Sequence, residues 1–253
     1  MRTIALYSNK GGVGKTAAAV NLSYLAARTG ARTLICDIDP QSSATYYFRV
    51  KPKIKSGAKG FLKGGKKVFK SIKGTDYSNL DLLPADFSYR RLDIEFSQLK
   101  RSKNRLHRIL KSFEAEYDVV ILDCPAGISV LAENVLNTVN CTLVPLIPTT
   151  LSVRTYLQLL VFCKKNKIDT SRIYSFFSMV DRRKKLHLSL MEKVSRKLSN
   201  ALKSDIPYLS MIEQMGVYRE PVVAFSPGSR ASKAYQRLWH NLQKTAVLNH
   251  SRK

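Results

Sequence analysis

Residues 9–17 read Asn-Lys-Gly-Gly-Val-Gly-Lys-Thr-Ala, a run of residue types suited to binding phosphates. Glycines allow successive backbone N–H groups to turn toward phosphate oxygens. A lysine after them can place a positive charge on the β- and γ-phosphates, and a threonine hydroxyl can bind Mg²⁺. We therefore predict a nucleotide-binding loop that contains Gly11, Gly12, Val13, Gly14, Lys15, Thr16 and Ala17.

Lys10 occupies the position where the general phosphate-loop pattern has its first glycine. One loop needs only one lysine for its own phosphates, so two interpretations of Lys10 are open. The side chain can reach the nucleotide of a neighbouring subunit, as an arginine finger does. Alternatively, it is a surface lysine that raises the affinity for anions.

The segments on either side of the loop are those that a phosphate site requires. Residues 3–7 form an apolar run of strand length, and residues 17–27 form a run of helix-forming residues. Phosphates would then meet a helix N-terminus, where unpaired N–H groups and the helix dipole favour anions.

Acidic residues follow two further strand-like runs. Asp123 closes the apolar run 119–122, and a charge at the end of a buried strand needs a partner such as Mg²⁺. Asp37 and Asp39 follow the run 32–36 and share one face because they are two residues apart. One would orient an attacking water and the other would join the Mg²⁺ shell. An ordinary Asp-Pro turn, and solvation of the strand end at Asp123, are the alternatives.

Strand-like and helix-like runs alternate along the chain. We predict strands over 2–7, 32–36, 80–83, 118–122, 141–146 and 172–178, and helices over 15–29, 90–114, 128–138, 152–165, 184–203 and 229–246. This alternation indicates an α/β fold with a mostly parallel sheet and helices on both faces. Function is then expected at the carboxyl ends of the strands, where the glycine loop and the acids fall.

Several of these motifs together resemble the ParA/MinD family of P-loop ATPases. The segment 10–16 resembles its deviant Walker A motif, 37–41 its second motif, and 119–123 a Walker B strand; 144–148, 177–182 and 235–239 follow in the family's order. The resemblance implies one ATPase domain over residues 1–253, with ATP and Mg²⁺ as cofactors. It also implies an ATP-dependent homodimer in which Lys10 acts in trans.

The resemblance extends to individual residues. It ties Asp39, with Lys10 and Lys15, to hydrolysis, and it places Met179, Asp181 and Arg182 near the base. Together with the residue chemistry above, it gives Thr16, Asp37 and Asp123 as the expected Mg²⁺ site.

Composition limits the class of protein. A chain of 253 residues with 44% hydrophobic content and no Pro/Ser-rich linker fits one large domain. No run approaches the roughly 18 apolar residues of a membrane span. The first residues lead directly into a strand-like run and do not show a signal-peptide pattern. The scattered cysteines fit neither a zinc site nor a disulfide framework, so we expect buried free thiols in a cytoplasmic protein: Cys36, Cys124, Cys141 and Cys163.

The charge balance is strongly basic. Lysine and arginine number 43 and acids 18, which gives a net charge of +25. No acid occurs over 40–75 or 221–253, and a basic, insert-like segment spans about 49–75. Such an excess attracts polyanions, and non-specific DNA is the expected partner because no base-reading motif is present. Tyr208 and Met211 replace the arginines that the family uses, so the expected contacts are chosen by charge and location: Arg196, Lys197, Arg219, Arg230, Lys233 and Arg237.

We therefore expect a ParA-like ATPase that binds non-specific DNA in its ATP state and releases it on hydrolysis. A ParB-like or other adaptor would stimulate it, and the cycle would partition or position DNA or a large protein cargo at the nucleoid. Two alternatives remain. One is a MinD-like membrane-surface regulator, since residues 60–70 mix apolar residues with lysines. The other is a metabolic P-loop enzyme that activates a carboxylate.

Overall fold

The computed structural model describes residues 1–52, 54, 57–98 and 104–245. Parts of three predicted segments lie outside the described residues: positions 53, 55 and 56 of the basic segment, 99–103 of the helix predicted over 90–114, and everything after 245.

A single eight-stranded sheet, ordered β3-β4-β2-β5-β1-β6-β7-β8, organises the described residues into one P-loop domain. Its pairs are parallel except β3 with β4, which are antiparallel. Strands β5 and β2 are fully buried, as expected of strands covered on both faces. The strands are β1 (Arg2–Leu6), β2 (Thr33–Asp37), β3 (Lys73–Gly74), β4 (Leu80–Leu83), β5 (Val119–Asp123), β6 (Cys141–Leu146), β7 (Ile173–Val180) and β8 (Ala201–Pro207).

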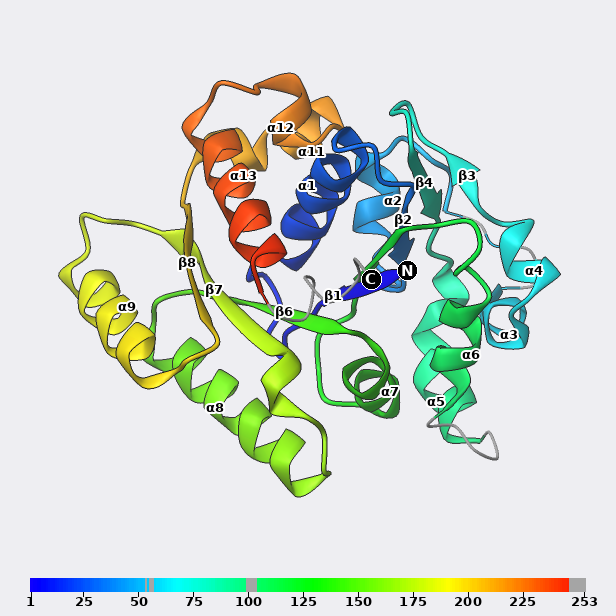
Figure 1. The fold of residues 1–253 in the computed structure, drawn as a ribbon, viewed down its shortest axis with the longest axis horizontal. Coiled ribbons are helices and arrows are strands. Elements are labelled where there is room, and N and C mark those ends of the chain that lie inside the picture. The colour runs from blue at the N-terminus through cyan, green and yellow to red at the C-terminus, as the bar shows by residue number, and fades with distance from the viewer. Residues whose placement is uncertain (53, 55–56, 99–103, 246–253) are drawn as a thin grey trace.

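Helices cover both faces of the sheet (Figure 1). Helices α1, α12 and α13 contribute to one hydrophobic cluster, and α3, α5, α6, α7 and α8 to the other. The helices are α1 (Lys15–Arg28), α2 (Ser43–Tyr47), α3 (Gly57–Lys63), α4 (Lys66–Phe69), α5 (Leu92–Ser97), α6 (Arg105–Lys111), α7 (Val130–Thr138), α8 (Thr150–Lys165), α9 (Lys185–Lys197), α10 (Ser210–Glu213), α11 (Met215–Tyr218), α12 (Val222–Phe225) and α13 (Arg230–Gln243), with short 3₁₀ helices η1 (Phe87–Arg91) and η3 (Thr170–Arg172).

The α/β architecture and all six predicted strands are confirmed. The helix predicted over 184–203 is wrong at its end, because α9 stops at Lys197 and the edge strand β8 begins at Ala201. An edge strand is half exposed and carries polar residues, so its composition resembles that of a surface helix. The helix predicted over 90–114 is also wrong, since α5 and α6 are separate elements.

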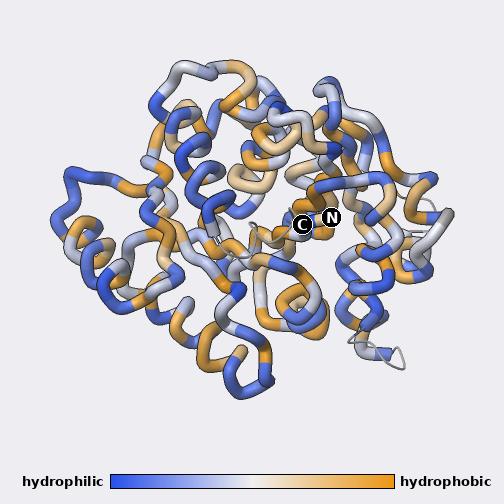
Figure 2. The backbone as a smooth tube through the Cα atoms, in the orientation of Figure 1, coloured by the Kyte–Doolittle hydropathy of each residue, from blue (hydrophilic) through white to orange (hydrophobic). Residues whose placement is uncertain are grey.

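Helices α1 and α13 form the packed layer behind the nucleotide loop. Small residues of α1 such as Ala18 and Ala26 are completely buried, which lets the helix approach β1 and β5 closely. On α13, Leu238 and Trp239 turn inward while charged residues turn outward. The helix predicted over 229–246 is therefore confirmed for its described part, and it packs on the core. Figure 2 shows hydrophobic residues along the central strands, and hydrophobic and hydrophilic residues alternating along the outer helices.

The basic segment folds against helices α5 and α6, and its apolar residues belong to the same hydrophobic cluster as those of α7. Phe61, Leu62 and Val68 are at most 4% exposed and join the hydrophobic cluster on that face. Phe69 stacks edge-on against Phe113. The apolar residues that motivated the membrane alternative are thus used in the core.

The four cysteines are buried and form no disulfide, as predicted. Within the described residues, none of the helices combines the length and the apolar character needed to cross a membrane.

Candidate functional site

The glycine loop joins the end of β1 to the start of α1. Gly12 and Gly14 have positive φ angles of 68° and 92°, which glycine adopts without steric cost. A Cβ atom at Gly14 would also lie 2.8 Å from the Ser178 Oγ atom, so the loop needs glycine there for two reasons. Gly14 is the N-cap of α1, and the loop therefore presents its N–H groups at a helix N-terminus.

A cavity of about 630 Å³ opens above this loop. Its volume is ample for a nucleotide-sized ligand. It is lined by the whole predicted loop and by residues from distant segments: Gly11, Gly12, Val13, Gly14, Lys15, Thr16, Ala17, Asp39, Pro40, Gln41, Ser43, Tyr47, Pro125, Ala126, Met179, Ile212 and Glu213. The structure thus brings Lys15, Thr16 and Asp39 to one site.

Asp123 is the most unusual charged group beside the cavity. It is completely buried, and neither of its carboxylate oxygens has a hydrogen-bond partner among the described residues. Burial, and then the charge of Asp37 on the neighbouring strand, raise the pKa of Asp123 well above its usual range, while Thr16 and Lys15 oppose that shift. A buried carboxylate without partners is costly, and a bound cation would compensate it.

Asp37 is equally buried but fully hydrogen-bonded. Its Oδ2 atom accepts from the Thr45 backbone N–H at 2.8 Å and from the Thr45 hydroxyl at 2.7 Å. Its Oδ1 atom accepts from the Asp39 backbone N–H at 3.2 Å. Burial raises the pKa of Asp37 to about 6 against these hydrogen bonds. Asp37 therefore anchors α2 and the Asp39 loop, and Asp123 is the better placed of the two to meet Mg²⁺.

Asp39 lies at the cavity wall with less protein contact. It is half-buried, and its Oδ1 atom accepts from the Gln41 backbone N–H at 2.9 Å. A partly exposed carboxylate that lines the cavity can hydrogen-bond a water there.

Lys15 and Lys10 occupy different environments. Lys15 is buried, with 7% of its surface exposed, and it lines the cavity. Lys10 is half-buried and does not line it. The Lys10 backbone N–H donates to the Ser8 hydroxyl at 3.1 Å, which fixes the start of the loop.

The residues expected near the base are only partly brought together. Met179, with a positive φ of 54°, lies between the main cavity and a smaller one of about 60 Å³. Asp181 and Arg182 line neither cavity, which does not fit the expectation from sequence. Asp181 instead pairs with Arg183 at 2.9 Å, which lowers the pKa of Asp181 to about 2, and Arg182 pairs with Asp205 at 2.9 Å.

Sequence reasoning missed several residues that line the cavities. Tyr47 comes from α2, and Tyr208, Ile212 and Glu213 come from the end of β8 and from α10. The Ile206-Pro207 pair, with which β8 ends, was the available signal, but the helix predicted over 184–203 covers the start of that strand.

The expected DNA contacts fall into three groups. On α13, Arg230, Lys233 and Arg237 are exposed at spacings of three and four residues, so they share one helix face. Arg196 and Lys197 end α9, where Arg196 pairs with Glu192. Arg219 stands apart from both groups.

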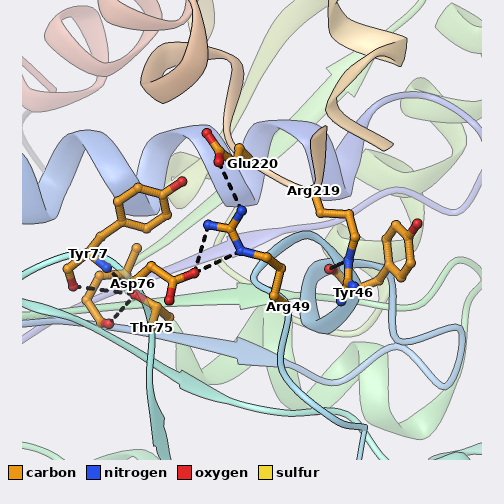
Figure 3. A network of polar contacts seen from close by, with 8 residues as sticks. Tyr46, Arg49, Thr75, Asp76, Tyr77, Arg219 and Glu220 are labelled. Atoms are coloured by element: carbon orange, nitrogen blue, oxygen red, sulfur yellow. Dashed lines mark hydrogen bonds and ion pairs between the residues drawn. The ribbon is translucent and has the colours of Figure 1, made fainter. Parts of the chain in front are cut away.

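Arg219 belongs to a network that ties α2 to the segment before α12 (Figure 3). Its guanidinium lies 4.4 Å from the centre of the Tyr46 ring and donates to the Tyr46 carbonyl at 3.0 Å. Next to it, Arg49 bridges Asp76 at 2.7 Å and Glu220 at 2.9 Å. The Arg219 charge is therefore partly engaged within the protein, unlike those of α13.

Comparisons with known proteins agree with this site. A family model described as an AAA domain matches residues 1–173. The sporulation initiation inhibitor protein Soj of Bacillus subtilis is 29% identical over 240 residues, which covers 92% of this chain and 95% of Soj. A ParA family protein of Chlamydia muridarum is 29% identical over 252 residues, covering 96% of this chain and 97% of that protein.

A solved structure shares the fold. The septum site-determining protein MinD of Pyrococcus horikoshii, complexed with Mg-ADP, superimposes with a TM-score of 0.77 at 22% identity, covering 96% of each chain. With the deviant glycine loop, the buried Asp123 and the eight-stranded sheet, these matches show that the chain belongs to the ParA/MinD family of P-loop ATPases.

Proposed function

We propose that the protein is an ATP-dependent switch that holds non-specific DNA in its ATP state and releases it after hydrolysis. The observation that carries the nucleotide part is the cavity over the glycine loop, with Asp123 unpartnered beneath it. The observation that carries the DNA part is the exposed basic face of α13, defined by Arg230, Lys233 and Arg237. Cycling would serve partitioning or positioning of DNA or a large protein cargo.

Magnesium fits the residues present. Thr16 and Asp123 would hold it, since oxygen ligands suit Mg²⁺ and the Asp123 carboxylate has no other partner among the described residues. The ion would supply charge stabilisation at the β- and γ-phosphates. The MinD relative was solved with Mg-ADP, which supports the same cofactor here.

The protein's own residues divide the remaining work. The loop N–H groups and the Lys15 ammonium bind the phosphates, and Asp39 orients the water that attacks. Tyr47, Met179 and Ile212 offer apolar surface beside the loop for the base. Lys10, which does not line its own cavity, would reach the nucleotide of a second subunit in an ATP-dependent homodimer.

A partner protein is expected to stimulate hydrolysis, because cargo must control release. A ParB-like or other adaptor fits this role, and the complex would act at the nucleoid in the cytoplasm. The MinD-like alternative, binding acidic lipid, loses its main support because Phe61, Leu62 and Val68 are buried.

The test is binding of an arbitrary-sequence DNA duplex with ATP, ADP or no nucleotide, beside a Lys10→Ala variant. We expect the wild type to bind more tightly with ATP and the variant to lose that increment. Equal affinity in all nucleotide states would contradict the switch. Vesicle flotation with ATP, in the absence of ATP-dependent DNA binding, would move the assignment to the membrane alternative. A requirement for a small carboxylate substrate before phosphate is released would indicate a metabolic enzyme.

A further inference from the structure

A second basic surface lies away from the proposed site. It consists of the exposed lysines of the folded basic segment, Lys59, Lys63, Lys67, Lys70 and Lys73, and is called the lysine face below. None of them lines the nucleotide cavity. Figure 1 shows α3 and α4 at one end of the longest axis and α9 at the other, with α13 on the α9 side of the molecule.

In the folded basic segment, apolar side chains are buried and lysine side chains are exposed. On α3 and α4, Phe61, Leu62 and Val68 face the core while Lys59, Lys63 and Lys67 remain in solvent. The lysines are therefore held on ordered backbone, and their arrangement follows from burial of the residues between them. Lys59 and Lys63 are one helical turn apart, about 6 Å. Each DNA strand carries one phosphate charge per about 3.4 Å of helix axis, a charge density high enough for both lysines to lie near phosphates.

Acidic side chains do not neutralise these lysines. Each of the seven ion pairs among the described residues uses an arginine. The acids nearest in sequence to the segment are also engaged: Asp76 with Arg49, Asp81 with the Tyr117 hydroxyl, and Asp86 with the Ile54 and Ser88 backbone N–H groups. Among the described residues, no ion pair therefore offsets the charge of the lysine face.

Duplex DNA suits this surface better than a lipid bilayer does. Binding in a membrane interface needs an apolar face beside the basic one, and the apolar face of α3 and α4 is buried. Phe87 and Ile94 are exposed nearby on η1 and α5, so a lipid arm belongs in the test. Exposed lysines on helices that bury their own apolar residues are suited to sequence-independent phosphate contacts.

We propose that the lysine face is a second DNA-backbone site that works in every nucleotide state. One protein would then hold two DNA segments in its ATP state, one at α13 and one at the lysine face, and keep only the second after hydrolysis. The bridging step rests on the proposed ATP-dependent contact at α13, whereas the lysine face itself does not.

The test compares two triple variants of equal charge. Lys59, Lys63 and Lys67 are changed to Gln in one, and Lys164, Lys165 and Lys167 in the other. The control lysines are exposed at or just after the end of α8 and form no ion pair with a described residue. DNA affinity is measured with ADP bound, across a salt series, and folding is checked by thermal melting and nucleotide binding.

We expect the lysine-face variant to lose about tenfold or more in ADP-state affinity and to flatten the slope of log K against log salt by about 3, while the control keeps both. In the ATP state it should retain ATP-dependent binding but fail to recruit a second labelled duplex to immobilised DNA. Equal losses in both variants would show an effect of net charge alone, and an unchanged first variant would remove the site. Loss of anionic-vesicle binding without loss of DNA binding would assign the face to lipid and overturn the proposal. If Lys10→Ala did not change ATP-dependent binding, the proposed switch would be wrong, but the ADP-state comparison would still test the lysine face.

Discussion

At the residue scale, the loop depends on glycine at one position more than at its neighbours. Gly14 combines a φ of 92° with a prospective Cβ contact of 2.8 Å to Ser178 Oγ, whereas a Cβ on Gly11 meets nothing within 4 Å. We expect Gly14→Ala to destabilise the fold by about 1–3 kcal/mol and to abolish ATP binding, because strain and contact both displace the N–H groups. Chemical unfolding and nucleotide titration measure this.

Gly11→Ala is the matched control, since Gly11 has neither the positive φ nor the close neighbour. It should stay close to the wild type in stability. If Gly14→Ala bound ATP as tightly as Gly11→Ala, the geometric account of the loop would fail.

Asp123 gives a prediction in which stability and binding move in opposite directions. Asp123→Asn replaces a buried carboxyl group, whose charged form is penalised by burial, with an amide that cannot ionise, so the nucleotide-free protein should gain about 1 kcal/mol in unfolding free energy. The same change should remove the benefit of Mg²⁺ to nucleotide affinity. Thermal melting with and without Mg²⁺ and EDTA checks both parts, and a variant that keeps the Mg²⁺ effect would show that another residue holds the ion.

At the element scale, Thr45 links β2, α2 and β4. Its hydroxyl donates to Asp37 Oδ2 at 2.7 Å and accepts from the Ala85 backbone N–H at 2.9 Å, and all three groups are buried. Thr45→Val keeps the shape but leaves Ala85 N–H unpaired and Asp37 Oδ2 with one bond fewer. We expect a loss of about 2–4 kcal/mol and lower ATPase activity, because α2 and the Asp39 loop lose their anchor.

Thr45→Ser is the informative comparison, since it keeps the hydroxyl and removes only a methyl group. It should retain most of the stability and activity measured by denaturant unfolding and phosphate release. Equal damage from Ser and Val would mean that packing at Thr45, and not its hydrogen bonds, positions α2.

The sequence predicted those parts of the site that are local. The glycine loop, its strand and its helix are contiguous, so the spacing alone identifies Gly14, Lys15 and Thr16 as site residues. Glu213 and Tyr208 could not be identified in that way. They lie almost 200 residues after the glycine loop, on a short helix and directly after an edge strand, and only the fold brings them to the cavity. Arg182 and Asp181, which the resemblance places near the base, form ion pairs with Asp205 and Arg183, and spacing alone does not reveal such pairs.

At the scale of the whole molecule, strand order explains why the acids converge. Strands β2 and β5 are neighbours in register, with Asp37 opposite Asp123, and β1 adjoins β5 on its other side. The carboxyl ends of three central strands thus place the loop and both acids at one edge of the sheet. Topology of this kind is inferred from a family resemblance more readily than from the pattern of apolar residues, which gives no strand order.

The distribution of charge over the molecule leads to the last prediction. Arg230, Lys233 and Arg237 share the exposed face of α13, and none of the three forms an ion pair with a described residue. Changing all three to Gln should lower ATP-state DNA affinity and flatten its salt slope by about 3, while basal ATP hydrolysis stays unchanged.

Arg196→Gln on α9 should have a smaller effect per charge, because Glu192 already offsets that guanidinium. Salt titrations with ATP, in parallel with phosphate release, distinguish these outcomes. If the α13 variant kept the wild-type slope while Arg196→Gln flattened it, the ATP-dependent DNA surface would lie on α9, and the unpaired charge of the α13 helix would serve only to keep the protein apart from its neighbours in solution.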